Sequence, residues 1–252
     1  MVPRALVFNV AFYLNTIVQV LLWSPVLLLP RRFIWKPVHS WATVTHWLLR
    51  TICGTRVEIR HPERIPTGPA IVAPKHQSTW ETYTLADLLN DPVFVFKREL
   101  VWIPIFGWYV AKARMIPVQR GARAIALASV TIRAHEEIRA DDGRQIIMFP
   151  EGTRRAVGAE PAYKYGVVHL YEELGVPCVP VALNAGVYWP RRSLRIRPGK
   201  IIMEFLEPIP PGLDKDVFTK RLQTSIETAT ARLVAEANAA LGEKPAPAPK
   251  AP

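Results

Sequence analysis

The sequence predicts an α/β fold behind an apolar N-terminal segment. Short apolar runs alternate with stretches in which apolar residues recur at helical spacing, and such alternation is typical of α/β sheets. The chain has 252 residues, half of them hydrophobic, so it can bury the core of one large domain and is not intrinsically disordered as a whole. We expect a membrane-associated two-helix motif at 1–50, an α/β domain at 51–241 and a disordered tail rich in Pro and Ala at 242–252.

The first of these parts has the composition of a membrane-embedded segment. No charged residue occurs between Arg4 and Arg31, and a helix of this length would reach about 39 Å, against about 30 Å for a bilayer core. Pro25 would end or kink that helix, and a second helical stretch from about Pro37 to Arg50 could cover its polar side. The residues of that polar side are Asn9, Asn15, Thr16 and Gln19. We therefore favour a two-helix hairpin embedded in one leaflet; the alternatives are a single spanning helix and a cleaved signal peptide.

Charge and tryptophan content favour an anionic membrane surface as a partner. The net charge is +11, and the first quarter of the chain is both strongly basic and strongly apolar. Because Arg31, Arg32 and Lys36 outweigh Arg4, we expect the downstream domain to face the cytoplasm from the inner membrane. No recognition motif accompanies the charge, so nucleic acid is not an expected partner. Half of the eight tryptophans lie near these cations, as is typical of the headgroup region: Trp23, Trp35, Trp41 and Trp47.

The remaining elements follow from the apolar pattern and its interruptions. Strands are expected at 70–74, 93–96, 115–118, 146–149, 178–183 and 201–205, and helices at 121–140, 166–174 and 216–241. The alternating arginines from Arg191 to Arg197 predict a further edge strand. Cys53 and Cys178 lie in apolar sequence, which predicts two buried free thiols and neither a disulfide nor a metal site.

The segment from Lys75 to Glu81, KHQSTWE, follows the first expected strand. A neutral imidazole can take a proton from a hydroxyl group when a carboxylate holds its other nitrogen. Within one regular helix His76 and Glu81 would lie roughly 140° apart, so they can meet only if His76 precedes the helix and Glu81 lies in its first turn. Pro74 supports such a break. The alternative is a plain helix start, in which Ser78 and Glu81 form a capping box, and both interpretations can hold in part.

The hexapeptide at 149–154, FPEGTR, follows a later strand. We interpret it as a turn whose backbone amides and arginine hold a phosphate group; the alternative is a surface salt bridge on a turn. Because both motifs follow strand ends, they can meet at one edge of the sheet although about seventy residues separate them. The residues assigned to the phosphate site are Glu151, Gly152, Thr153, Arg154, Arg120 and Lys97.

In the order and spacing of these blocks the sequence resembles the 1-acyl-sn-glycerol-3-phosphate acyltransferase family, also called lysophosphatidic acid acyltransferases. The first family block, N-H-x-S-x-x-D, corresponds to 75–81 with Lys for Asn and Glu for Asp. The block FPEGTR is intact at 149–154, and V-P-V occurs at 179–181. The segment 117–120 keeps the terminal arginine of another block, and 97–100 matches a further family stretch. The resemblance covers roughly residues 65–190.

The resemblance implies a central mixed, mostly parallel sheet and a membrane-bound enzyme of phospholipid biosynthesis. Its acceptor would be lysophosphatidic acid, its product phosphatidic acid, and its donor acyl-CoA or an acylated acyl carrier protein, with no bound cofactor and no metal. His76 and Glu81 would be catalytic, Lys75 and Ser78 supporting, and backbone amides at the start of the following helix would stabilise the oxyanion. The alternatives are an acyltransferase for another lyso-lipid, such as a lyso-ornithine lipid or a lysophospholipid, and a non-catalytic lipid-binding protein on the same scaffold.

Overall fold

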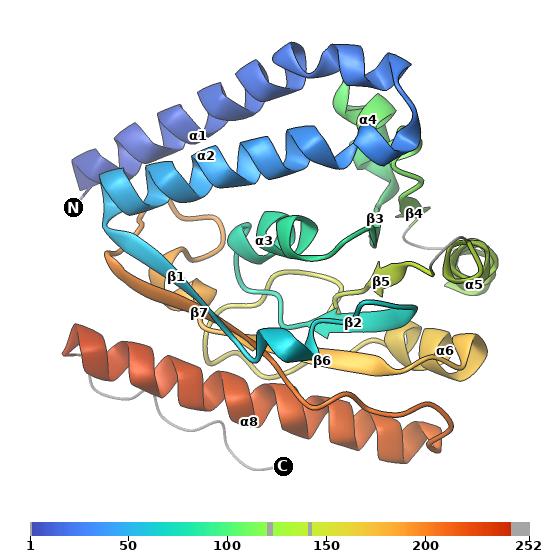
Figure 1. Cartoon of the computed structure of the whole chain (residues 1–252). Helices are drawn as coiled ribbons and strands as arrows, with labels where there is room; N and C mark the ends of the chain where they lie inside the picture. Colours follow the sequence, from blue (N-terminus) through green and yellow to red (C-terminus); the bar gives the residue numbers. More distant parts are fainter. Residues whose placement is uncertain (1, 120–122, 141–142, 243–252) are drawn as a thin grey trace.

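A seven-stranded sheet crosses the computed structural model, which describes residues 2–119, 123–140 and 143–242 (Figure 1). Neighbouring strands are parallel except β6 and β7, which are antiparallel, so the predicted mixed and mostly parallel sheet is confirmed. The central strands β2 and β6 are buried throughout, because helices cover both faces of the sheet. In spatial order the strands are β1 (Thr55–Arg60), β7 (Gly199–Phe205), β6 (Cys178–Leu183), β2 (Ala70–Pro74), β5 (Gln145–Ile147), β3 (Pro92–Lys97) and β4 (Ile116–Val118).

Helices form a layer on each side of this sheet. In Figure 1, α1 (Val2–Leu22) and α2 (Trp35–Cys53) lie side by side above α3 (Trp80–Leu88). The opposite layer contains α6 (Tyr165–Leu174) and the long α8 (Lys215–Leu241), while α5 (Arg123–Ile138) flanks the edge at β4. The short helices are α4 (Phe106–Lys112) and α7 (Ala185–Tyr188), and the 3₁₀ turns are Ser24–Leu28, Arg31–Phe33, Pro62–Arg64 and Arg98–Trp102.

The first two helices form the hairpin that the sequence predicts. Pro25 lies in the 3₁₀ turn that follows α1, so the chain reverses where the helix would be broken. The polar side of α1 faces α2: Asn15 Nδ2 donates to Thr45 Oγ1 at 3.1 Å, and Trp41 Nε1 donates to Thr16 Oγ1 at 3.0 Å. Polar groups that would be costly in an apolar environment are thereby satisfied inside the hairpin.

The outer side of α1 is apolar and exposed. Among the described residues, α1 over Pro3–Leu22 is the one helix long and apolar enough to cross a membrane, judged by length and composition. The inner side belongs to the protein core, because Phe8 and Phe12 pack edge-on against Trp189. The exposed apolar residues of α1 are Leu6, Val7, Val10, Tyr13, Leu14, Ile17, Val18, Leu21 and Leu22.

An ionic cluster also fixes the hairpin to the sheet. Asp91, between α3 and β3, accepts two hydrogen bonds from Arg31, at 3.0 and 2.8 Å, and one from Trp35 Nε1 at 2.7 Å. Arg144, which is 1% exposed, donates to Asp91 Oδ1 at 2.9 Å and pairs with Glu137 on α5. Burial favours the neutral acid, but the hydrogen bonds from Arg31 and Trp35 and the charge of Arg144 together hold the pKa of Asp91 below its ordinary value.

Two expectations fail or fall outside the structure. The segment from Arg191 to Arg197 contains no strand; it forms a turn with Arg192 in the left-handed region at φ +52°, between Pro190 and Pro198. The expected tail at 242–252 lies outside the described residues except for Gly242, which ends α8. Cys53 and Cys178 are buried free thiols, as predicted.

Candidate active site

The loop between β2 and α3 places the imidazole of His76 against Glu81. Because β2 ends at Pro74 and α3 begins at Trp80, His76 precedes the helix while Glu81 lies in its first turn. Glu81 Oε1 lies 2.8 Å from His76 Nδ1, and it also accepts the backbone N–H groups of Gln77 at 2.8 Å and Ser78 at 2.7 Å. The structure therefore brings the predicted pair together.

Glu81 has two functions in this geometry. Ser78 Oγ accepts the N–H of Trp80 at 3.3 Å, while Glu81 returns to the N–H of Ser78, which is the reciprocal pattern of a capping box. The same carboxylate orients His76 so that Nδ1 is the donor and Nε2 keeps its lone pair. The amides of Gln77 and Ser78 are committed to Glu81, so these two are not oxyanion donors, and the expectation about amides at the start of α3 stays a prediction.

The second motif reaches the same loop because β5 pairs directly with β2, with Val72 opposite Ile147. The turn closes through a hydrogen bond of 2.9 Å from the N–H of Gly152 to the carbonyl of Phe149, and Gly152 adopts φ +62°, a conformation that favours glycine. The Phe149 ring stacks on the His76 ring with centroids 3.8 Å apart. The N–H of Arg155 donates to the carbonyl of His76 at 2.8 Å, so the two motifs are in direct contact.

Glu151 does not face this shared surface. Its side chain is buried and accepts from Lys75 Nζ at 3.1 Å; Lys75, 3% exposed, also donates to Glu227 on α8 at 2.7 Å. Burial raises the pKa of Glu151, although Lys75 opposes that effect. Tyr163 Oη donates to Glu227 at 2.9 Å and completes the cluster. This position corrects the expectation that the Glu151 carboxylate is a phosphate ligand: it holds the turn to β2 through Lys75.

The side chain of Arg154 contacts the residue that precedes α3. Its Nη1 donates to Thr79 Oγ1 at 2.7 Å, and Arg191 donates to its carbonyl oxygen. Gly152 and Thr153 are exposed at the tip of the turn. Glu151 and Arg154 thus contact different neighbours, and the alternative of a simple surface salt bridge between them does not describe the turn.

Of the two further candidate cations for the phosphate site, Lys97 and Arg120, the structure describes Lys97. Lys97 is exposed at the end of β3, where its Nζ pairs with Glu99 at 3.2 Å. Arg120 lies outside the described residues. Sequence reasoning missed Glu227, Thr79 and Arg191 as partners of the site. Glu227 and Arg191 lie outside the motifs, and Thr79 occupies a position that the first block leaves unspecified.

Comparisons with known proteins decide the family. An acyltransferase family model matches residues 56–184. A protein of Pseudomonas aeruginosa named 1-acyl-sn-glycerol-3-phosphate acyltransferase is 35% identical over 200 residues, which cover 77% of each of the two chains. The chain belongs to the 1-acyl-sn-glycerol-3-phosphate acyltransferase family. An Escherichia coli protein of the same name is 32% identical over 181 residues, covering 69% of this chain and 71% of that protein.

A solved structure shows that the acyltransferase shares its fold with a distant relative. The crystal structure of the 1-acyl-sn-glycerophosphate (LPA) acyltransferase PlsC from Thermotoga maritima superposes with a TM-score of 0.77. The match covers 92% of this chain and 98% of that chain at 22% sequence identity.

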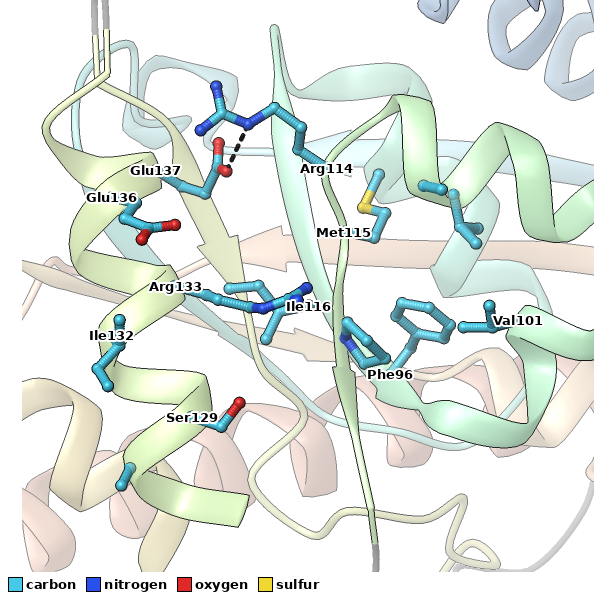
Figure 2. A pocket seen from close by; sticks show the side chains of 14 residues that line it. Phe96, Val101, Arg114, Met115, Ile116, Ser129, Ile132, Arg133, Glu136 and Glu137 are labelled. Atoms are coloured by element: carbon cyan, nitrogen blue, oxygen red, sulfur yellow. Dashed lines mark ion pairs between the residues drawn. The ribbon is translucent and has the colours of Figure 1, made fainter. Parts of the chain in front are cut away.

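A cavity of about 850 Å³ in the acyltransferase is separate from this site (Figure 2). It lies between α5 and β4, where Arg133 reaches toward Ile116, and Arg114 Nε pairs with Glu137 Oε1 at 2.8 Å at its upper end. Two strands, β5 and β3, stand between β2 and β4, so β4 is roughly 14 Å from β2, the strand that leads to His76.

A second cavity of the acyltransferase, of about 420 Å³, adjoins the site itself, because Gln77 and Arg155 line it. Over the parts of the chain that the structure describes, no three His, Cys, Asp or Glu side chains gather in a way that could hold a metal ion.

Proposed function

We propose that this acyltransferase transfers a fatty acyl group from an acyl thioester to the sn-2 hydroxyl of 1-acyl-sn-glycerol 3-phosphate and so makes phosphatidic acid. The names of the relatives support the acceptor and the product. The observation that carries the proposal is the contact of 2.8 Å between His76 Nδ1 and Glu81 Oε1, in a loop that also touches the FPEGTR turn.

In the proposed reaction His76 Nε2 takes the proton of the acceptor hydroxyl as its oxygen attacks the carbonyl carbon of the thioester. The carboxylate of Glu81 stabilises the imidazolium that forms, as the acid of a Ser-His-Asp triad does. When the tetrahedral intermediate collapses, the C–S bond breaks and the thiolate takes the proton from Nε2. The acyl group passes directly between substrates, and His76 ends the cycle neutral.

The acceptor phosphate is assigned to Arg154 and the exposed tip of the turn, Gly152 and Thr153. Arg154 has a fixed position because Thr79 holds its Nη1, and a guanidinium group suits the dianionic oxygens of a phosphate. Since Thr79 precedes α3 directly and Glu81 is in the first turn of α3, this cation and the base are held by the same few residues.

We also propose that the hairpin lies in the cytoplasmic leaflet of the inner membrane. The apolar outer side of α1 would be in lipid, while the exposed Arg32 and Lys36 would meet anionic headgroups; Arg31 is already paired with Asp91. In this position the acceptor and the product would reach the site without leaving the membrane. The donor is acyl-CoA or an acylated carrier protein, which would approach from the cytoplasm.

The test is thiol release from an acyl thioester in the presence of lysophosphatidic acid by the full chain in mixed micelles. Wild type should release thiol, and His76→Ala should lose activity by about 10²- to 10⁴-fold. His135→Ala, at a half-buried position of α5, is the matched control and should keep wild-type activity. Full activity of His76→Ala would refute the mechanism. A panel of lyso-lipids separates the other acceptors, and lipid binding without thiol release by wild type would favour a binding protein.

A further inference from the structure

The cavity of about 420 Å³ beside the site is rich in positive charge. Three arginines line it, Arg155, Arg191 and Arg197, and among its lining residues in the described chain there is no carboxylate. It opens beyond the carboxyl ends of β2 and β6, where α/β folds bind ligands. Its volume lies within the ordinary range for small-molecule sites.

Two of these arginines donate to neutral backbone carbonyl groups, which fix the guanidinium groups without neutralising them. Arg155 Nη2 donates to the carbonyl of Glu160 at 2.7 Å, and Arg191 Nη1 donates to that of Arg154. Glu151 Oε1 is 3.9 Å from Arg155 Nε, but Lys75 Nζ pairs with the same oxygen at 3.1 Å. Guanidinium groups that are fixed in a cavity whose described lining has no carboxylate attract phosphate oxygens.

The side chain of Gln77 adds a neutral hydrogen-bond donor to the lining of the cavity. Gln77, 1% exposed, accepts the N–H of Gly186 on its Oε1 at 3.0 Å, so its amide nitrogen is the end left to donate. Gly186 is needed there, because a Cβ at this position would come within 2.8 Å of Val157 Cγ2 and 3.0 Å of Gln77 Cβ. This close packing fixes the position of the Gln77 side chain, and Gln77 directly follows the base His76 in the sequence.

We propose that this cavity is a second phosphate subsite, in which Arg191, Arg155 and Gln77 bind a phosphate monoester of one substrate. The inference rests on the proposed function and adds Arg191, which lies beyond the segment that the family model matches, to the binding residues. Two substrates carry such a group. One is coenzyme A, through its 3′-phosphate; the other is lysophosphatidic acid, whose single phosphate would then lie here instead of at Arg154. The chemistry of recognition is the same for both.

Kinetics with paired substrates distinguish the two sources. Arg191→Gln should raise one KM by about 10- to 100-fold while kcat stays within a few-fold, and Arg191→Lys should recover part of the loss. If KM rises for lysophosphatidic acid alone, the acceptor occupies the subsite. If KM rises for acyl-CoA but is unchanged for acyl-dephospho-CoA, the donor occupies it. Unchanged KM values for both substrates would overturn the proposal.

The controls keep folding and function separate. Arg195→Gln changes an exposed arginine of the same segment that does not line the cavity, and it should leave both KM values unchanged. Gln77→Glu places a carboxylate in the cavity without a change of size and should weaken binding in the same direction as Arg191→Gln. Calorimetric titration of wild type with glycerol 3-phosphate and with adenosine 3′,5′-bisphosphate tests the subsite without turnover. Absence of thiol release would refute the function, whereas failure of both probes to bind would refute the subsite.

Discussion

Replacing Glu81 by glutamine separates its charge from its role as a cap. Glu81 Oε1 accepts three hydrogen bonds, two from backbone amides and one from His76. Glutamine keeps an acceptor oxygen of the same reach, so the two amides stay paired and the free energy of unfolding should fall by no more than about 1–3 kcal/mol. Alanine leaves both buried amides unpaired and should cost about 2–6 kcal/mol.

The effect on turnover follows from the charge. In the proposed mechanism the imidazolium forms 2.8 Å from a carboxylate, and a hydrogen bond to a charged partner is worth about 1.5–3 kcal/mol. Loss of that charge in Glu81→Gln should lower kcat by roughly 10- to 100-fold, less than the loss expected for His76→Ala. Glu81→Asp keeps the charge but is shorter by one C–C bond, about 1.5 Å. Its kcat should lie between those of wild type and Glu81→Gln.

Two measurements decide this prediction. Thiol release at saturating substrate gives kcat for wild type and the Gln, Asp and Ala variants of Glu81, and circular dichroism in the same detergent gives their thermal stability. Wild-type kcat for Glu81→Gln would show that the carboxylate charge is not used. An unchanged melting temperature for Glu81→Ala would show that the capping bonds contribute nothing.

Three further predictions concern buried charges and thiols. Lys75→Met should lower the free energy of unfolding by about 3–5 kcal/mol, because it leaves the buried Glu151 carboxylate without its main partner. Adding Glu151→Gln should recover most of the lost stability. If urea titrations show that the effects of the two substitutions simply add, the pairing is contradicted. Asp91 has a lowered pKa, so the unfolded chain binds its proton at a higher pH than the folded chain. Its contribution to stability is therefore complete above about pH 4 and lost as the pH falls through the folded pKa, and Asp91→Asn should flatten that acid limb of the stability profile measured by denaturant unfolding. Burial raises the pKa of Cys53 to about 11 and raises that of Cys178 as well, so a disulfide reagent should label both slowly in the folded protein and rapidly in urea; fast native labelling would refute their burial.

Local signals were sufficient for the contact between His76 and Glu81. The contact depends on whether the helix starts after the histidine. Pro74 and the capping pattern of Ser78 both indicate this start, and both lie within a few residues of His76. The hairpin was predictable for a similar reason, since a break at Pro25 and a polar side on α1 are both visible in the sequence.

The position of Glu151 could not be predicted in the same way. Its direction depends on Lys75 and on Glu227, a residue of α8 that becomes its neighbour only when the sheet is assembled. The segment from Arg191 to Arg197 was predicted wrongly as a strand because its arginines alternate. Prolines on both sides and a left-handed residue within make it a turn, and this turn carries Arg191 to the cavity.

The two-sided character of α1 limits how the protein can be handled in the laboratory. Phe8 and Phe12 cover one side of the core. Deleting α1 to obtain a water-soluble form would therefore expose the core while it removes the apolar outer side of the helix. Purification therefore requires detergents or lipids that cover the apolar outer side of α1 without displacing α1 and α2. A variant that lacks α1 should aggregate.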